Sequence, residues 1–246
     1  MGLQNKQNVV EINQGTDDLR QHLTETEEVI LKRRSVRMYK KKPVPEYMIK
    51  RILEAGRFAP SAGNCQPWKF IVVNDTEIIA GLTETTVNLC KITKKTLDYR
   101  QKGLEWVKPI TKFITRLKKA DFHPTPFGAV SFIADGKLGL YHGAPLVILI
   151  FKDVRGISNP DLDCGIAGQN MVLAAHAMGL GTCWVGFTKL AFQYSRKWKK
   201  FFGIEYPYKF ISSIGIGYPV GEPDGMIPRE THATLWYENG ERKLIY

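Results

Sequence analysis

Four short apolar runs stand out along the chain, each bounded by glycine, proline or polar residues. They cover residues 69–74 (KFIVVN), 142–151 (HGAPLVILIF), 182–187 (TCWVGF) and 210–219 (FISSIGIGYP). Short, continuous apolar runs rich in β-branched residues are typical of buried strands. The pattern therefore predicts a strand at each of these positions.

The segments between the runs show helical patterns. Apolar residues recur at helical spacing after Pro45, with Glu46 near the expected helix start. Residues 161–181 predict a long helix of small residues suited to close packing, and Gly179 lies where that helix would end. Residues 195–204 predict a basic helix.

Two further segments carry loop and turn signals. Residues 121–139 mix proline, glycine and aromatic residues, which predicts a loop that forms a lid or wall, or a mere insertion. Asn239 and Gly240 form a turn signal in the polar and aromatic tail. Because strands alternate with helices and no internal repeat is evident, we expect an α/β or α+β fold with a central sheet.

Length and composition favour one large domain. The chain has 246 residues, of which 43% are hydrophobic, enough for one substantial core. The longest apolar run, residues 144–151, is far too short to span a membrane, and the N-terminal segment does not resemble a secretory signal. The four cysteines show no Cys-x-x-Cys spacing, which favours reduced thiols and a cytoplasmic location.

Positive charge is concentrated in one segment. Residues 91–119 contain ten Lys or Arg and two Asp or Glu, a net charge of +8. Nucleic acid, an anionic surface or an anionic cofactor or substrate are possible partners. The simpler interpretation is a solvated helix face, because apolar residues recur at helical spacing opposite the lysines: Trp106, Ile110, Phe113, Ile114 and Leu117.

Several catalytic motifs are absent from the sequence. No Gly-x-Gly-x-x-Gly follows a predicted strand, and neither a P-loop nor a Gly-x-Ser-x-Gly elbow occurs. The five histidines are scattered without zinc-ligand spacing, so we expect no metal site. An enzyme without its own nucleophile or metal usually relies on a cofactor.

Residues 59–68 (APSAGNCQPW) are unusually elaborate for a connection between a helix and a strand. Ser61, Asn64 and Gln66 supply side-chain donors and acceptors, and Gly63 allows a close backbone approach. This combination favours a polar, planar bound partner.

This segment and three others resemble the FMN-dependent nitroreductase superfamily: residues 33–39 (RRSVRMY), 165–187 (GIAGQNMVLAAHAMGLGTCWVGF) and 214–223 (IGIGYPVGEP). The resemblance implies an α+β fold with a central, mostly antiparallel sheet flanked by helices, and a homodimer with FMN at the interface. It implies a flavin domain over 29–246, with a cationic helical and loop insertion at about 91–135, after an N-terminal arm or helix at 1–28. The chain lacks a cysteine cluster for an iron–sulfur centre, so we expect a stand-alone flavin domain.

The resemblance assigns two basic segments to the FMN phosphate. Arg33, Ser35 and Arg37 supply two charges and a hydroxyl, and Arg34 is a further candidate that faces the other way in an extended run. The alternative is a solvated basic turn that continues into three lysines. Arg229 matches more loosely the position of a late basic residue near the phosphate in relatives.

The resemblance assigns two other segments to the flavin ring. The first lines the ring and ribityl chain from across the dimer: Pro60, Ser61, Ala62, Asn64 and Gln66. Many relatives carry serine where this chain has Ala62, and Gln66 either contacts the flavin or braces the loop. The second runs along the central ring with a backbone N–H directed at N5: Cys183, Trp184, Val185 and Gly186. Cys183 itself is expected to be a buried structural thiol rather than a catalytic one.

The expected activity is electron transfer from NADH or NADPH through FMN to a small acceptor, such as a nitroaromatic or a quinone, by a ping-pong route. Three alternatives stay open. The chain could be a flavin-binding electron carrier, a specialised flavin reductase such as a dehalogenase, or a basic module that binds nucleic acid or a membrane surface. The first interpretation includes neither nucleic acid nor a membrane as a partner.

Overall fold

Strand β2 (Leu146–Asp153) lies at the centre of the fold with both faces buried. Alternate side chains enter two separate hydrophobic clusters, with Leu146, Ile148 and Ile150 on one face and Val147, Leu149 and Phe151 on the other. A strand covered on both faces needs apolar residues at every position. This is why the run at 144–151 is continuous rather than alternating.

The computed structural model describes residues 22–97, 103, 105–110, 113, 124–157, 159–221 and 232–244. The chain divides into two compact units. The larger unit comprises Arg33–Pro223, and the smaller comprises Met1–Lys32 and Asp224–Tyr246. All described residues that bear on the candidate site belong to the larger unit.

The sheet of the larger unit has the order β1-β2-β4-β3, with every neighbouring pair antiparallel. Its other strands are β1 (Trp68–Val73), β3 (Gly181–Val185) and β4 (Tyr208–Gly217). These strands confirm the predicted positions and the predicted antiparallel sheet. Strands β1 and β3 form its two edges.

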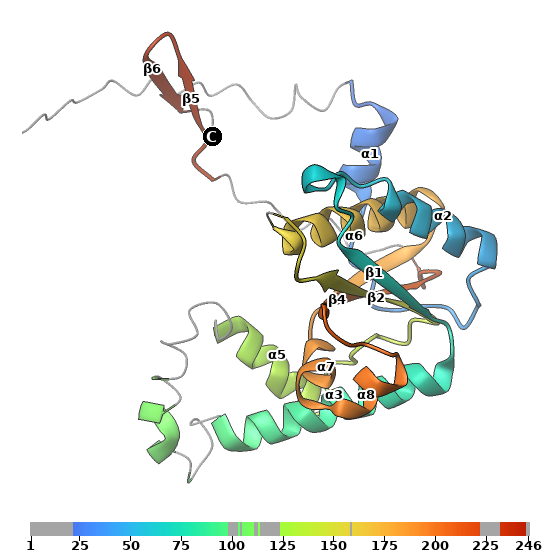
Figure 1. Cartoon of the computed structure of the whole chain (residues 1–246), viewed down its shortest axis with the longest axis vertical. Helices are drawn as coiled ribbons and strands as arrows, with labels where there is room; N and C mark the ends of the chain where they lie inside the picture. The colour runs from blue at the N-terminus through green and yellow to red at the C-terminus, as the bar shows by residue number, and fades with distance from the viewer. Residues whose placement is uncertain are drawn as a thin grey trace, which may run out of the picture. The chain divides into compact units, whose positions relative to one another are not determined.

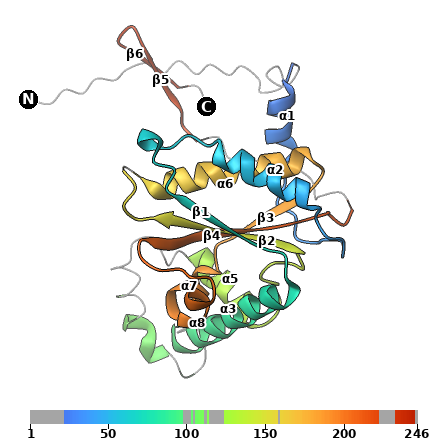
Figure 2. The same ribbon diagram turned by 45° about the vertical axis from the view of Figure 1, so that its right-hand side comes forward.

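Helices cover both faces of this sheet (Figures 1 and 2). One face carries α2 (Glu46–Arg57) and α6 (Pro160–Ala177), and the other carries α3 (Thr76–Leu97), α5 (Pro124–Ala134), α7 (Lys189–Tyr194) and α8 (Arg196–Phe201). The predicted helices at 46 onward, 161–181 and 195–204 are thus confirmed. Gly179 has a φ of 76° directly after α6, as the helix-end prediction requires.

The prediction of a loop across 121–139 is wrong for residues 124–134, which form α5, whereas residues 135–139 form turns and a loop. Two prolines misled the sequence interpretation, although Pro124 and Pro126 lie in the first helical turn, where a missing N–H costs no intrahelical hydrogen bond. Lys94 of α3 contacts the carboxylate of Asp135 at 2.6 Å and ties the end of α5 to α3.

Part of the cationic segment also differs from the expected amphipathic helix. A short 3-10 helix, η3 (Glu105–Val107), is present, but Trp106, Ile110 and Phe113 are all exposed rather than packed inward. Val107 is the buried residue of η3. Ile114 and Leu117 lie outside the described residues.

The smaller unit contains α1 (Glu25–Lys32) and a hairpin of β5 (Leu235–Glu238) and β6 (Glu241–Leu244). Thr24 and Glu27 form a reciprocal capping box at the start of α1. Asn239 and Gly240 both have positive φ, which confirms the predicted turn. Among the described helices of the chain, none combines the length and apolarity needed to cross a membrane.

Candidate functional site

Residues 33–39, called the strap below, lie along the outer edge of β3. Ser35 forms a parallel bridge with Thr182, and the Val36 N–H donates to the Thr182 carbonyl oxygen at 2.9 Å. Close approach depends on Gly181, because a Cβ there would lie 2.6 Å from the Val36 side chain. The Tyr39 hydroxyl lies 2.8 Å from the Val36 carbonyl oxygen and holds the end of the strap.

Beyond the strap, no strand of the described residues pairs with the outer edge of β3, which is called the open edge below. The Thr182 carbonyl points outward to the strap, and successive residues of an antiparallel strand face opposite sides. The N–H and C=O of Trp184 and the N–H of Gly186 therefore also point outward, whereas Cys183 and Val185 face β4. Within the described ranges, no backbone group pairs with the outward groups of Trp184 or with the Gly186 N–H.

A buried chain of hydroxyls fixes the last peptide of this edge. The Ser213 hydroxyl donates to the Val185 carbonyl oxygen at 2.7 Å, Thr188 Oγ1 lies 3.1 Å from Ser213 Oγ, and the Tyr141 hydroxyl lies 2.7 Å from Thr188 Oγ1. Burial raises the pKa of Tyr141 to about 12, so this hydroxyl stays protonated. Because a trans peptide holds its C=O and N–H in opposite directions, the cluster also fixes the outward direction of the Gly186 N–H.

The side chains of 183–185 point away from the open edge. The Trp184 indole packs over Gly168 of α6, where a Cβ would lie 2.2 Å from the ring. Val185 enters the core. Cys183 is 6% exposed, and burial raises the pKa of its thiol, against the opposing effect of Arg37. This segment therefore offers its backbone, and a neutral thiol agrees with a structural role for Cys183.

The strap brings positive charge to this edge. Arg37 acts electrostatically on Cys183 and His142, whereas Arg33 and Arg34 act on His176 near the end of α6. Burial lowers the pKa of both histidines, and the arginines lower it further. The sequence interpretation missed His142 as a neighbour of the strap. Its positive φ of 55°, which is uncommon outside glycine, has no signature in the sequence.

The second candidate segment, residues 60–66, follows α2 and contains η2 (Ala62–Asn64). The Ser61 hydroxyl accepts from the Gln66 N–H at 2.9 Å, and Gln66 Nε2 donates to Asn64 Oδ1 at 3.0 Å. Asn64 and Gln66 both have positive φ. Gln66 thus braces the loop, whereas Pro60 and Asn64 are exposed and available to a partner molecule.

These two segments lie at opposite corners of the sheet. The loop precedes Trp68, which is level with Lys152 at one end, whereas the strap bridges Thr182, which is level with Ile216 at the other end. Strand spacings of about 4.8 Å and a rise of about 3.3 Å per residue separate them by about 25 to 30 Å. The open edge itself, at Trp184 and Gly186, lies three strands across the sheet from β1 and is level with Val72 and Phe70, so residues 60–66 and this open edge lie at opposite edges of one chain's sheet.

Some predicted features lie wholly or partly outside the described residues. Arg229 lies outside the described residues, as does part of the predicted lid or wall. Across the described part of the chain, no group of three or more His, Cys, Asp or Glu side chains is positioned to hold a metal ion.

Comparison with known proteins identifies the family. A family model described as the nitroreductase family matches residues 30–218, so the chain belongs to the nitroreductase family. A relative from Methanothermobacter thermautotrophicus, which carries the name NADH dehydrogenase/NAD(P)H nitroreductase, is 29% identical over 215 residues, covering 85% of this chain and 86% of the relative.

Two further similarities are informative. The FMN-bound nitroreductase of Desulfitobacterium hafniense DCB-2 superposes with a TM-score of 0.64 at 22% identity, covering 87% of this chain and all of that chain. Iodotyrosine deiodinase 1 of Rattus norvegicus is 28% identical over 142 residues, covering 57% of this chain and 41% of the deiodinase. The structural similarity confirms the predicted fold.

Proposed function

We propose that this protein is an FMN-dependent NAD(P)H oxidoreductase that works as a homodimer and reduces nitroaromatics, quinones or similar small acceptors. The observation that carries the proposal is the open backbone edge of β3 at Trp184 and Gly186, with Arg37 of the strap close enough to act electrostatically on Cys183. Membership of the nitroreductase family and the fold shared with an FMN-bound member support it.

The residues at this edge fit FMN chemically. Arg33, Arg37 and the Ser35 hydroxyl offer two positive charges and a neutral donor to a phosphate dianion. The outward N–H and C=O groups of Trp184 and the N–H of Gly186 offer donors and an acceptor to a flat heterocycle. Gly186 is exposed, and a Cβ there would meet nothing within 4 Å, so a ring can approach the backbone closely.

FMN, when bound, supplies the chemistry by accepting a hydride from NADH or NADPH and passing two electrons to the acceptor. The protein binds and orients it. The Ser213–Thr188–Tyr141 hydroxyls hold the Gly186 N–H in one direction, so that this dipole is preorganised where negative charge develops. Protons for the acceptor come from water, so no side chain of the chain has to act as a general acid.

The position of the two segments at opposite edges of the sheet supports the homodimer. Residues 60–66 lie beside β1 and the open edge belongs to β3, so in this proposal a second copy contributes the loop to the FMN bound along β3. In the proposed dimer, Asn64 of the partner subunit and its exposed neighbours complete the site. The two-fold arrangement creates two equivalent sites.

The visible absorption spectrum of the purified protein tests the cofactor. We expect flavin bands that bleach without oxygen after addition of NADH or NADPH, and light scattering that gives twice the mass of one chain. If no flavin is present and none binds on reconstitution, the proposal fails. A flavin-loaded monomer would retain the cofactor assignment but reject the shared site.

A second candidate is reductive dehalogenation of a halogenated phenol, favoured by the similarity to iodotyrosine deiodinase 1. In that reaction two electrons and a proton replace a carbon–iodine bond by a carbon–hydrogen bond and release iodide. Iodide release from 3-iodotyrosine by the reduced protein, together with slow turnover of nitroaromatics and quinones, would favour this candidate. The reverse pattern would favour the general reductase.

A further inference from the structure

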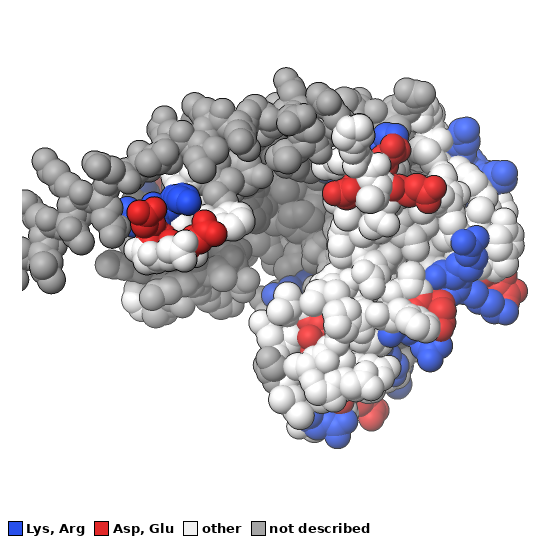
Figure 3. All heavy atoms as spheres, turned by 90° about the horizontal axis from the view of Figure 1, so that it is seen from above, with Lys and Arg blue, Asp and Glu red and all other residues white. Residues whose placement is uncertain are grey.

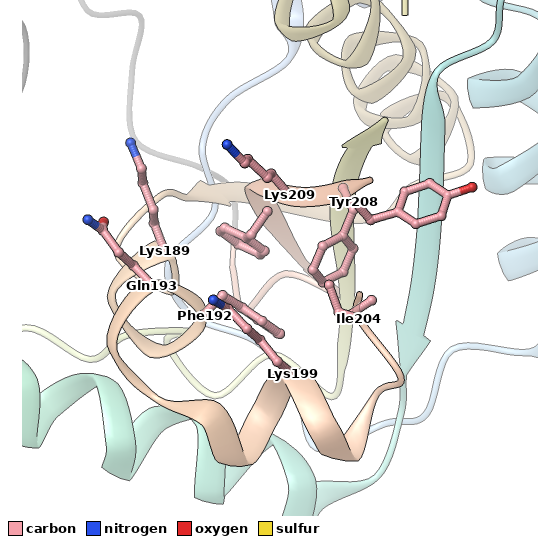
Figure 4. Close-up of a pocket in the computed structure, with 9 residues that line it drawn as sticks. Lys189, Phe192, Gln193, Lys199, Ile204, Tyr208 and Lys209 are labelled. Atoms are coloured by element: carbon pink, nitrogen blue, oxygen red, sulfur yellow. The ribbon is translucent and has the colours of Figure 1, made fainter. Parts of the chain in front are cut away.

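A cavity of about 350 Å³ lies between α7, α8 and the start of β4 (Figure 4). Its floor is aromatic, formed by Phe151, Phe192 and Phe210, and lysines stand around it: Lys189, Lys199 and Lys209. Neither the strap, nor residues 60–66, nor β3 lines this cavity. It is therefore separate from the proposed flavin site.

The rings of the floor are packed firmly against one another. The rings of Phe192 and Phe210 stack with centroids 4.8 Å apart and planes 11° apart, and Phe151 meets the Phe192 ring edge-on at 5.1 Å. Phe151 and Phe192 are buried in the core, so neither ring is free to move away. These packed rings give the cavity a preformed apolar floor.

The rim carries positive charge from three separate elements. Lys189 belongs to α7, Lys199 to α8 and Lys209 to β4, and the side chains surround the floor in Figure 4. Among the described residues, no carboxylate lies within ion-pair distance of these three ammonium groups. Their mutual repulsion is therefore not relieved by a described acidic side chain.

The opposite face of the sheet shows a different arrangement. Lys50 pairs with Glu46 at 2.7 Å and Arg57 with Glu54 at 2.7 Å along α2. Basic and acidic side chains lie interspersed on the surface shown in Figure 3. Among the described residues the cavity lysines have no such acidic partner, and an anion would supply one.

We propose that this cavity binds a small aromatic anion, of the aryl carboxylate class, at a site distinct from the proposed flavin site. The volume falls in the range of small-molecule pockets, which is about 300 to 1,000 Å³. An inorganic anion would leave the aromatic floor uncovered, and a neutral aromatic molecule would leave the three ammonium groups unneutralised. A flat ring with one carboxylate satisfies both features, and the Gln193 side chain on the rim adds a hydrogen-bonding group.

Calorimetric titration with 2-naphthoate tests this site, with 2-naphthamide as the neutral counterpart of the same shape. We expect 2-naphthoate to bind and 2-naphthamide to bind about tenfold or more weakly. Lys189→Gln, Lys199→Gln and Lys209→Gln should each weaken 2-naphthoate binding about threefold, as for single exposed charges. The triple variant should weaken it about 30-fold. Lys50→Gln on α2 is the matched control and should change nothing.

The visible spectrum of any bound flavin, followed in the same titrations, separates this site from the flavin site. Binding that perturbs the flavin and is unchanged in the triple variant would overturn the proposal and locate the ligand over the flavin. Equal binding of 2-naphthamide would overturn the anion requirement. If 2-naphthoate fails to bind but poly-glutamate does, the lysines form a docking surface for an acidic partner and the proposal is wrong. Unchanged thermal unfolding of the triple variant would establish that it is folded.

Discussion

The two halves of the proposed flavin site are built in different ways. The strap and β3 are held by the core of their own chain, because Gly181 admits Val36 and the Ser213 hydroxyl holds the Val185 carbonyl. Residues 60–66 are held mainly by their own side chains, with Gln66 bonded to Ser61 and Asn64. The first half is a supported backbone edge, and the second is an exposed, self-braced loop.

In the proposed dimer, these two halves have different roles. The supported edge has a fixed shape before any partner arrives, so it can define the position of the ring. The loop has left-handed residues at Asn64 and Gln66, and its internal hydrogen bonds hold this strained conformation without burial. A loop that must reach a neighbouring subunit cannot depend on its own core for support.

Mixing subunits of two variants should give the largest effect on activity. Arg33→Ala homodimers and Asn64→Ala homodimers should each bind FMN at least about tenfold more weakly, because each loses a polar contact to the cofactor. When the two variants are mixed and reassociated, half of the dimers are mixed and each contains one intact site. Activity should then recover to about a quarter of that of the unmodified protein.

A sample of Arg33→Ala chains carrying two different tags serves as the control and should show no recovery. If tag capture demonstrates mixed dimers of the two variants but activity does not return, both residues act on the same chain. The division between the two halves would then be incorrect.

Gly181→Ala should disturb only the supported half. The new Cβ would lie 2.6 Å from the Val36 side chain, so the strap has to move away from β3. We expect a loss of about 1 to 3 kcal/mol in unfolding free energy and protein that purifies with little flavin. Gly128→Ala in α5, where a Cβ meets nothing within 4 Å, is the matched control and should retain its flavin. Full flavin content in Gly181→Ala would show that the strap does not define the site.

Ser213→Ala should destabilise the half of the site formed by the strap and β3 less than Gly181→Ala does. Removing this hydroxyl leaves Thr188 with one partner fewer and loosens the Val185 peptide, at a cost of about 1 to 2 kcal/mol measured by denaturant unfolding. FMN affinity should fall about threefold to tenfold. Ser131→Ala removes another buried hydroxyl, one without a hydrogen-bond partner in the described structure, and should be neutral or stabilising. Equal effects of the two substitutions would exclude a specific role for the Ser213 cluster.

Lowering the pH should have the smallest of these effects, and it acts on the unfolding free energy. Burial, followed by the strap arginines, holds the pKa of His142 and His176 below the ordinary value of 6.5. The unfolded chain therefore binds more protons near this pH, and the unfolding free energy should fall as the pH decreases through 6.5. His142→Gln with His176→Gln should flatten this dependence between about pH 7.5 and 5.5. An unchanged slope in thermal unfolding would contradict the electrostatic coupling to the strap.

Local patterns predicted the strands well because each apolar run is short, continuous and bounded by glycine, proline or polar residues. They failed at α5, where the same prolines suit a loop and a first helical turn equally. They left the role of Gln66 open, because only the folded loop shows its amide bonded to Asn64. They missed the proximity of His142 to Arg37, which depends on contacts distant in sequence.

The sequence by itself determined the four strands and the family resemblance, and that resemblance implied the antiparallel α+β class and the residues proposed to contact a flavin. The strands depend on local periodicity, and the resemblance depends on short motifs. Only the tertiary structure decided that the strap covers β3 as far as Thr182, that the edge beyond it is open, and that residues 60–66 lie at the opposite corner. Strand order and register set these relations, and they arise from long-range pairing that no local pattern encodes.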